Sequence, residues 1–261
     1  MIRIENVEVC GWKSAIRGMR NPMNSWDKSD SFVCKDDLGE LTSEEIETIC
    51  GNCTKGIDKC DIYDKYPHFI VGNNDLTLMK KLAKAGTDHR KFMRMIVVYA
   101  DVTAPLYWWK EADTYKVGTV RNSCSTMHKI TEKEFTLDDF SHEHLLSRIA
   151  NDDDKCRVYI SPISALENQI KLLNAWRKEY LRSKNKDDWW QIIQLLPSSY
   201  NQRATLMLNY EVLANMYHTR KAHKLDEWVD FCKWIESLPY AELITGVNNK
   251  DLKVSVGANN G

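Results

Sequence analysis

Apolar side chains recur at helical spacing in the second half of the chain. Between 164 and 180 they occupy every third or fourth position, which places them on one face of a helix. Ser164 and Glu167 stand three residues apart at the start of this stretch, in the pattern of a capping box. The apolar positions are Leu166, Ile170, Leu173, Trp176 and Tyr180. The sequence therefore predicts a long amphipathic helix here.

Three more helices are predicted after it. One begins at Asp187-Asp188, whose carboxylates suit a first helical turn, and ends at Leu196-Pro197. The other two cover 204–220 and 223–238. In the last helix the residues that share an apolar face are Leu225, Trp228, Val229, Cys232 and Ile235. The second half of the chain is thus predicted to be helical throughout.

The first half has a different pattern. Residues 92–102 are rich in β-branched and apolar side chains, which predicts a buried strand. A helix capped by Asn74 or Asp75 precedes this strand, and Ala104-Pro105 ends it and leads into another helix. Strand signals first and helices afterwards indicate an α+β fold, with an antiparallel or mixed sheet and a helical C-terminal half.

No repeat, low-complexity tract or linker divides the sequence, so we expect one domain over residues 1–245. Residues 34–66 are dense in charged and cysteine residues, and we interpret them as an insertion or loop on that domain. Residues 246–261 are polar and rich in glycine and asparagine, which is typical of a C-terminal tail.

The overall charge gives no attraction to nucleic acid or to an anionic membrane, because the 261 residues carry a formal net charge of −1. A phosphate ligand must therefore be met by a local cluster of cations. The first six residues lack the apolar run of a signal peptide. No stretch approaches the roughly 18 apolar residues of a membrane span. We expect a cytoplasmic protein with no nucleic-acid or membrane partner.

The eight cysteines are not expected to form stable disulfides in a reducing compartment. Cys50, Cys53 and Cys60 form a C-x2-C-x6-C group that resembles half of a metal site. The second C-x2-C pair of such sites is absent from the sequence, so free thiols and no metal are expected. A structural or metal-stabilised interaction protein is the last of three functional hypotheses.

Polar residues interrupt the apolar pattern of the C-terminal half. Asn209 and Asn215 carry paired donors and acceptors that suit the edge of a nucleobase or a flavin. Arg203 and Arg220 carry planar guanidinium groups that suit phosphate. At about 100° per residue these positions do not form one helical stripe. They serve two neighbouring pockets, serve one pocket from adjacent subunits, or are ordinary polar residues of a helix surface.

These spacings resemble those of the flavin-dependent thymidylate synthases. In that family an arginine follows a Leu-Pro pair by six residues and an asparagine follows it by twelve. A second asparagine comes six residues later and an arginine five later still. The residues at the same spacings here are Pro197, Arg203, Asn209, Asn215 and Arg220. The resemblance covers residues 73–238.

Upstream of this segment the resemblance is partial. His89 and Ala104-Pro105 stand at the separation of a histidine and an Ala-Pro pair of the family. The family signature is R-H-R followed by a run that ends in S-x-R-Y, and it should fall near 114–128. Asn122 and Ser125 align with its asparagine and last serine, but R-H-R is absent.

The resemblance implies roles for individual residues. We expect Arg203 and Arg220 at the nucleotide, and His89, Asn209 and Asn215 at FAD. In the altered signature segment the groups that suit the nucleotide phosphate belong to Lys116, Arg121, Ser123 and Ser125.

Three further residues have side chains that could take part in chemistry or binding. Cys124 lies between the two serines, but the family's chemistry needs no protein nucleophile, so we interpret it as an inert thiol. Arg20 and Asn24 lie in a polar, proline-interrupted segment, and such loops often carry function. They are minor candidates beside an ordinary turn.

The implied activity is modification of the 5-position of a deoxyuridine-type nucleotide such as dUMP, by methyl or hydroxymethyl transfer from a folate. FAD carries the hydride in this family, with NADPH and methylenetetrahydrofolate as co-substrates, and the enzymes are homotetramers with active sites between subunits. The rival hypothesis is a catalytically inactive nucleotide-binding or sequestering protein of the same fold. Loss of R-H-R favours that rival, whereas both retained asparagines favour the enzyme.

Overall fold

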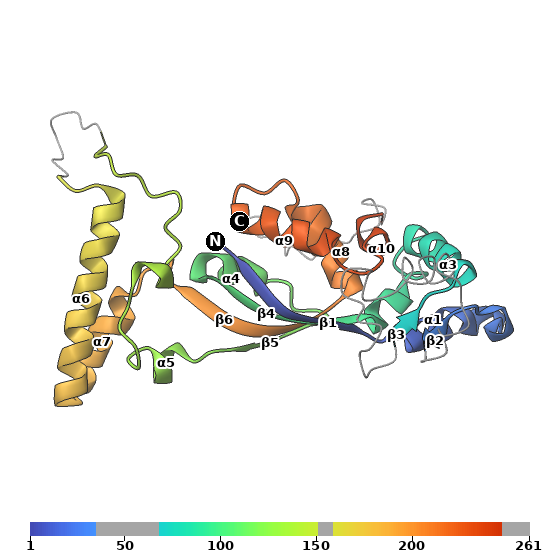
Figure 1. Cartoon of the computed structure of the whole chain (residues 1–261), viewed down its shortest axis with the longest axis horizontal. Helices are drawn as coiled ribbons and strands as arrows, with labels where there is room; N and C mark the ends of the chain where they lie inside the picture. Colours follow the sequence, from blue (N-terminus) through green and yellow to red (C-terminus); the bar gives the residue numbers. More distant parts are fainter. Residues whose placement is uncertain (35–67, 151–158, 247–261) are drawn as a thin grey trace, which may run out of the picture. The chain divides into compact units, whose positions relative to one another are not determined.

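The computed structural model describes residues 1–34, 68–150 and 159–246. The chain forms two compact units and passes between them several times. Figure 1 labels the helices and strands and colours them by residue number. The first unit contains Met1–Arg3, Val102–Thr114 and the described part of Asn122–Thr205. The second contains the described parts of Ile4–Asp101, Tyr115–Arg121 and the chain from Leu206 onward. The expectation of one domain over 1–245 stays a prediction, and the cysteine-rich insertion and the tail lie almost entirely outside the described residues.

Four strands form one sheet in the order β1-β4-β6-β5. They are β1 (Arg3–Cys10), β4 (Val97–Pro105), β5 (Thr119–Ser123) and β6 (Asn201–Asn209). β4 and β6 are antiparallel, because the Leu106 N–H donates to the Tyr200 carbonyl and the Tyr210 N–H donates to the Ile96 carbonyl. The predicted α+β class is therefore confirmed, and the sheet takes the antiparallel form of the two that were expected.

The predicted helix over 204–220 is wrong in its first part. β6 occupies those residues up to Asn209, and α8 (Tyr210–Arg220) begins only afterwards. Burial alternates along β6, with Ala204, Leu206 and Leu208 buried on one face. This period of two is the mark of a strand, but the apolar run around Leu206 also fits a helical period, so the pattern alone was ambiguous.

The predicted strand over 92–102 is displaced. Lys91–Met95 forms a 3₁₀ helix, η5, and β4 starts only at Val97. Within β4 the buried positions Val98, Ala100 and Val102 alternate with more exposed ones. The strand therefore has one buried and one more exposed face, as is common in antiparallel sheets. The apolar residues before it, Phe92 and Met93, are buried as part of η5.

The two longest helices of the first unit, α6 (Pro162–Ser183) and α7 (Lys186–Leu195), pack together over an aromatic core with Phe135 and Phe140. The predicted cap of the first helix is wrong. Ser161 is the N-cap, and its hydroxyl accepts the Ser164 N–H at 3.3 Å. The shorter elements of this unit are α4 (Leu106–Ala112), α5 (Thr126–Lys129) and the 3₁₀ helix η6 (Leu137–Asp139).

The second unit combines helices from both ends of the sequence. Its elements besides η5 and α8 are α1 (Trp12–Arg20), η1 (Asn21–Met23), η2 (Trp26–Lys28), β2 (Phe32–Cys34), β3 (His68–Ile70), α3 (Asn73–Lys84), α9 (Asp226–Glu236) and α10 (Glu242–Thr245). β2 and β3 pair antiparallel. The apolar face predicted for 223–238 is confirmed at Trp228, Cys232 and Ile235, which are buried in α9. No helix within the described ranges is long and apolar enough to cross a membrane.

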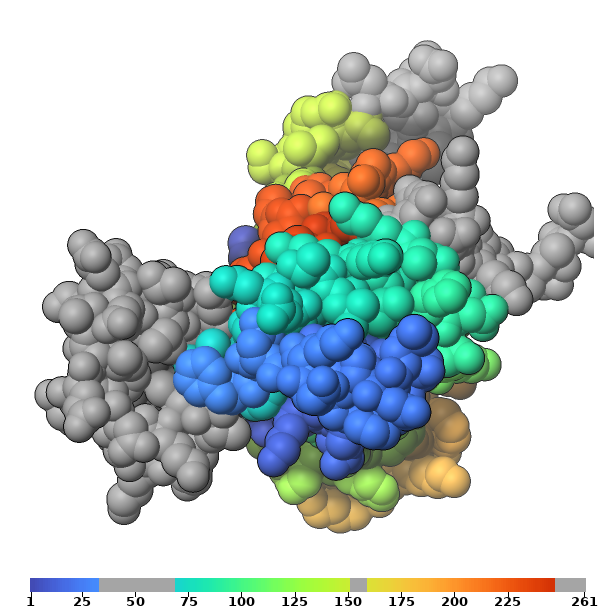
Figure 2. Space-filling view, turned by 90° about the vertical axis from the view of Figure 1, so that its right-hand side faces the viewer, coloured from blue at the N-terminus to red at the C-terminus, as the bar shows by residue number. Residues whose placement is uncertain are grey.

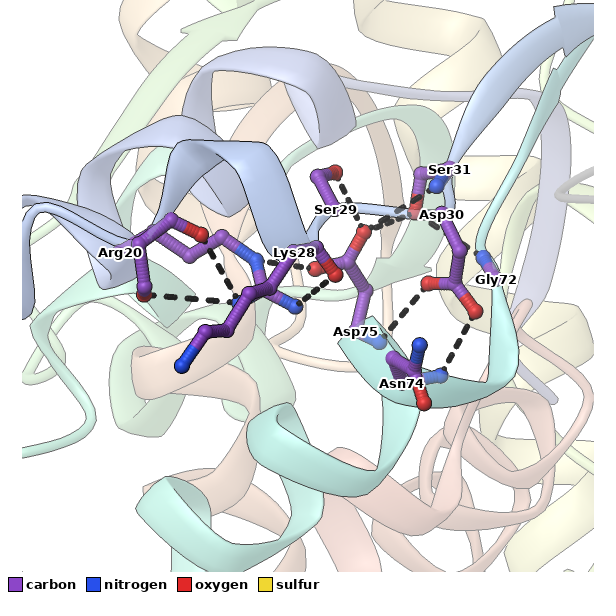
Figure 3. A network of polar contacts seen from close by, with 9 residues as sticks. Arg20, Lys28, Ser29, Asp30, Ser31, Gly72, Asn74 and Asp75 are labelled. Carbon is purple, nitrogen blue, oxygen red and sulfur yellow. Dashed lines mark hydrogen bonds and ion pairs between the residues drawn. The ribbon is translucent and has the colours of Figure 1, made fainter.

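The start of α3 is held by residues distant in the sequence, and this corrects the cap predicted at Asn74 or Asp75. Asp30 accepts the N–H groups of both residues, at 2.8 and 3.1 Å. The side chain of Asp75 instead turns inward and forms an ion pair of 2.6 Å with Arg20 at the end of α1, with both side chains almost completely buried. Figure 3 shows this network, which also includes Ser29. It fixes α1 against α3.

The Asp75 carboxylate depends on these donors for its charge. Burial by itself raises the pKa of Asp75, but hydrogen bonds from Ser31, Ser29 and Arg20, together with the Arg20 charge, hold the pKa below its ordinary value. Because the folded-state pKa is depressed, the carboxylate contributes stability above the unfolded-state value near pH 4, and this contribution is lost as the pH falls through the folded-state value.

Replacing Asp75 by asparagine should lower the free energy of unfolding by about 3–5 kcal/mol at neutral pH, because Arg20 is then buried without its counter-charge. The difference from wild type should shrink when urea unfolding is repeated at successively lower pH, as the pH falls through the depressed folded-state pKa of Asp75. Asp27→Asn, a change at an exposed carboxylate, serves as the control and should unfold like wild type. An Asp75→Asn protein with wild-type stability at neutral pH contradicts this account.

Candidate functional site

The residues predicted from the sequence divide between the two units. The second unit holds His89, Lys116, Arg121, Asn209, Asn215 and Arg220. The first unit holds Ser123, Ser125 and Arg203. Each group is therefore described within its own unit.

Arg220 is the last residue of α8, and its guanidinium is held by aromatic side chains. The Arg220 Nε donates to the Tyr115 hydroxyl at 3.0 Å. The guanidinium carbon lies 5.7 Å from the centre of the Tyr115 ring and 5.0 Å from the centre of the Trp228 ring. Trp228 is completely buried in α9, so it provides a fixed surface for the cation. Arg220 is thus oriented by two rings and one hydrogen bond.

His223 completes this cluster and gives it an unusual donor arrangement. Its Nε2 lies 3.0 Å from Arg220 Nη1, and its Nδ1 lies 3.2 Å from the Leu225 N–H. A neutral imidazole accepts a hydrogen bond at only one of its two nitrogens. The tautomer decides which ring nitrogen donates, and a proton on Nε2 would place a second donor beside the Arg220 guanidinium. An anion beside Arg220 and His223 would accept from both, which makes this corner suited to phosphate.

Asn209 lies at the other end of α8 and forms its N-cap. Its side-chain oxygen accepts the Val212 N–H at 2.9 Å. Its amide nitrogen faces Gly118, where an added Cβ would come within 2.3 Å of it. Gly118 also has a φ of 76°, which disfavours any other residue. The position of Asn209 is therefore set by the strand-to-helix junction and by the glycine opposite.

One short segment connects these two places. Tyr115 contacts Arg220, and Gly118, three residues later, contacts Asn209. The segment Tyr115–Gly118 therefore touches both ends of α8. It belongs to the stretch 114–128, where the sequence departs from the family signature.

Asn215 and His89 differ in exposure. Asn215 is half-buried in the middle of α8, and its carboxamide bonds to no residue in the described ranges, so it has donors and an acceptor to offer a flavin. His89 is exposed. Its neighbour Arg90 is completely buried and its Nε donates to both carboxylate oxygens of Glu211, at 3.0 and 3.1 Å. Sequence reasoning missed this pair, because nothing in the pattern shows that α8 passes beside residue 90.

In the first unit the backbone brings Arg203 beside the turn at Cys124. The Cys124 N–H donates to the Arg203 carbonyl at 2.9 Å, and both side chains are exposed. Ser125 accepts the His128 N–H at 3.2 Å and so caps α5. The end of β5, with Ser123 and the Ser125 cap that follows it, therefore lies beside Arg203.

Other candidate chemistry is limited in the described ranges. They contain no cluster of three or more histidine, cysteine or acidic residues that suits a metal ion. Cys50, Cys53 and Cys60 lie outside them. Arg20, flagged in the sequence, is committed to Asp75, Ser25 and Lys28 and is part of the scaffold.

Comparisons with known proteins identify the fold of this chain through its structure and not through its sequence. No protein-family model matches the chain, and no curated protein sequence matches it. Solved structures do match. A structure of thymidylate synthase X from Helicobacter pylori with FAD and dUMP has a TM-score of 0.57 and 14% sequence identity, covering 97% of this chain and 100% of that one. The chain has the flavin-dependent thymidylate synthase fold.

A second protein shares this thymidylate synthase fold. The UMP/dUMP methylase PolB from Streptomyces cacaoi, bound with 5-Br dUMP, has a TM-score of 0.51 and 14% identity, covering 95% of this chain and 96% of that one. The resemblance drawn from spacing is therefore confirmed at the level of the fold. At such identity the chemistry must be argued from the side chains of this chain.

Gly118→Ala tests the contact between the Tyr115–Gly118 segment and the cap of α8. The added Cβ must displace the Asn209 amide, so the variant should lose about 1 kcal/mol beyond the backbone strain of a positive φ. Gly86→Ala is the matched control, because its φ is 109° and nothing lies within 4 Å of the added Cβ. Urea unfolding should show a larger loss for Gly118→Ala. Equal losses would mean that the Asn209 contact carries no energy.

Proposed function

We propose that this protein binds a pyrimidine deoxynucleotide such as dUMP beside Arg220 and modifies the 5-position of its base with a bound flavin. The observation that supports this most is the segment Tyr115–Gly118, which contacts Arg220 at one end of α8 and Asn209 at the other. A cation and a carboxamide, both fixed by the same short segment, suit a ligand with a phosphate and a ring.

The anion-binding part of the proposal rests on the Arg220 corner. The guanidinium is already oriented by Tyr115 and Trp228, so little rotamer freedom is lost when a ligand binds. A phosphate beside this guanidinium would accept from Arg220 and from the ring nitrogen of His223 that carries a proton. His223 was not among the residues selected from the sequence.

The altered signature segment also supports the proposal. Residues that match the family spacing, Asn209 and Arg220, are contacted by residues where the chain departs from the signature, Gly118 and Tyr115. The departure from the signature therefore coincides with the residues that contact Arg220 and Asn209 in this chain. Lys116 lies between the two contacts and is exposed, so its ammonium adds positive charge to the same segment.

The remaining residues are proposed for the flavin and for the rest of the nucleotide. Asn215 would hold an edge of FAD, with His89 and the amide of Asn209 as further partners. FAD supplies hydride chemistry when it is bound. Arg203, Arg121, Ser123 and Ser125 are proposed for the nucleotide. A folate as the donor of the transferred methyl or hydroxymethyl group, NADPH as reductant, the homotetramer and a cytoplasmic location follow from the resemblance.

A nucleotide-binding protein without turnover is the second candidate, and one observation favours it. The side-chain oxygen of Asn209 caps α8, so the fold itself explains why this asparagine is present. Its retention no longer requires a flavin. The side chain of Asn215 forms no hydrogen bond within the described ranges, so the fold does not explain this asparagine. Asn215 is therefore the residue that favours the enzyme.

Arg220→Ala should weaken the binding of dUMP by about 10- to 100-fold in isothermal titration calorimetry, because a charged hydrogen bond to phosphate contributes about 1.5–3 kcal/mol. Tyr115→Phe should weaken it less, since the ring remains and only the hydroxyl that holds Arg220 Nε is lost. Arg94→Ala, at an exposed arginine of η5, is the control and should bind like wild type. Wild-type affinity in Arg220→Ala would exclude this arginine from the nucleotide site.

A further inference from the structure

Cationic and aromatic side chains surround a pocket of about 360 Å³ in the second unit. α1 contributes Lys13, Ile16 and Arg17, and the aromatic lining comes from Trp26, Phe32 and Phe69. The volume is at the small end of the range of about 300–1,000 Å³ that is typical of ligand sites. In Figure 2 this part of the chain, coloured blue, faces the viewer beside α3 in cyan. None of these residues belongs to the Arg220 corner.

Among the described residues, no acidic side chain pairs with Lys13 or Arg17, the two exposed cations of this pocket. Lys13 and Arg17 are exposed and lie one turn apart on α1, where like charges repel. Neither forms an ion pair with any residue in 1–34, 68–150 or 159–246. Arg20, one turn further along, differs because Asp75 neutralises it. The pocket therefore has two positive charges available for an anion.

The aromatic side chains offer surfaces for stacking. Trp26 is 50% exposed and Phe32 is 46% exposed, which is unusual for such large apolar rings. The indole N–H of Trp26 donates to the Asn21 side-chain oxygen at 2.9 Å, and this bond fixes the orientation of the ring. A fixed, half-exposed indole beside cations is the combination that proteins use to bind a base with its phosphate.

The polar residues at the base of the pocket are occupied, which makes them a rigid support for a ligand. Ser29 and Ser31 donate to Asp75 at 2.7 and 2.6 Å. Arg20 donates to Asp75 and to the carbonyls of Ser25 and Lys28. Figure 3 shows how these bonds join α1, the loop after it and α3. The pocket is thus preformed, and recognition falls to Lys13, Arg17 and the rings.

We propose that this pocket is a second ligand site, which binds a mononucleotide. The base stacks on Trp26 and Phe32, and the phosphate binds the Arg17 guanidinium with support from Lys13. This site is independent of the proposed reaction, because it shares no side chain with the residues assigned to that reaction.

Equilibrium dialysis of AMP and UMP against the full-length protein tests the site. Arg17→Ala and Trp26→Ala should each weaken binding about tenfold or more. Adenosine and inorganic phosphate should each bind more weakly than AMP, because adenosine lacks the phosphate and inorganic phosphate lacks the base. Added salt should weaken the binding of AMP but not that of adenosine. Lys81→Ala, at an exposed cation of α3 outside the pocket, is the control and should bind like wild type.

The same measurement in the Arg220→Ala protein separates this site from the proposed reaction site. Binding that survives Arg220→Ala but is lost in Arg17→Ala supports the second site, even if dUMP never binds at Arg220. Binding lost only in Arg220→Ala overturns the second site and leaves the proposed function standing. The second site is also overturned if no mononucleotide binds at millimolar concentration. The second site is likewise overturned if Arg17→Ala changes the sedimentation of the protein but not its nucleotide binding. That result would make the pocket an interface between copies of the chain.

Discussion

The candidate reaction site depends on how Arg220 is held. A half-buried guanidinium at the end of a helix has many rotamers, and each must be excluded before it can position a phosphate. The rings of Trp228 in α9 and of Tyr115 in the segment before β5 restrict these rotamers, because both lie against the Arg220 guanidinium. The contact of a desolvated cation with an aromatic face contributes up to about 2 kcal/mol. That energy is available before any ligand arrives, so the site is organised by the fold.

This arrangement explains how a chain can keep the fold and lose the signature. The segment Tyr115–Gly118 is fixed to α8 at two points, through the Tyr115 hydroxyl and through the space that Gly118 leaves for Asn209. Lys116, between these two points, is exposed, so a change of its charge leaves both contacts in place. The fold is therefore shared without the signature, and the chemistry must be argued from the residues that are present.

The sequence predicted the parts of the structure that local patterns determine. The helices at 162–183 and 226–236 have long apolar stripes, and the α+β class followed from the order of the elements. β6 was taken for helix because Leu206 and Leu208 lie in an apolar run that fits both periods. The spacing of Asn209 from Arg220 was informative, although it spans a strand end and a helix and not one helix.

What the sequence did not predict depends on contacts between distant residues. The partner of Arg220 lies 105 residues away, and the buried pairs of Arg20 with Asp75 and of Arg90 with Glu211 span 55 and 121 residues. No periodicity links such positions. The capping role of Asn209 was hidden as well, because it became visible only once the strand boundary was known. These contacts decide which candidates are scaffold and which can meet a ligand.

The most direct test of the proposed activity is the absorption spectrum of the protein after reconstitution with FAD and removal of excess cofactor, recorded during a titration with dUMP. The account predicts flavin bands that stay with the wild-type protein and shift saturably as dUMP binds, with the shift lost in Arg220→Ala. Protein that retains no flavin but still binds dUMP at Arg220 would contradict the enzyme and leave a nucleotide-binding protein in its place.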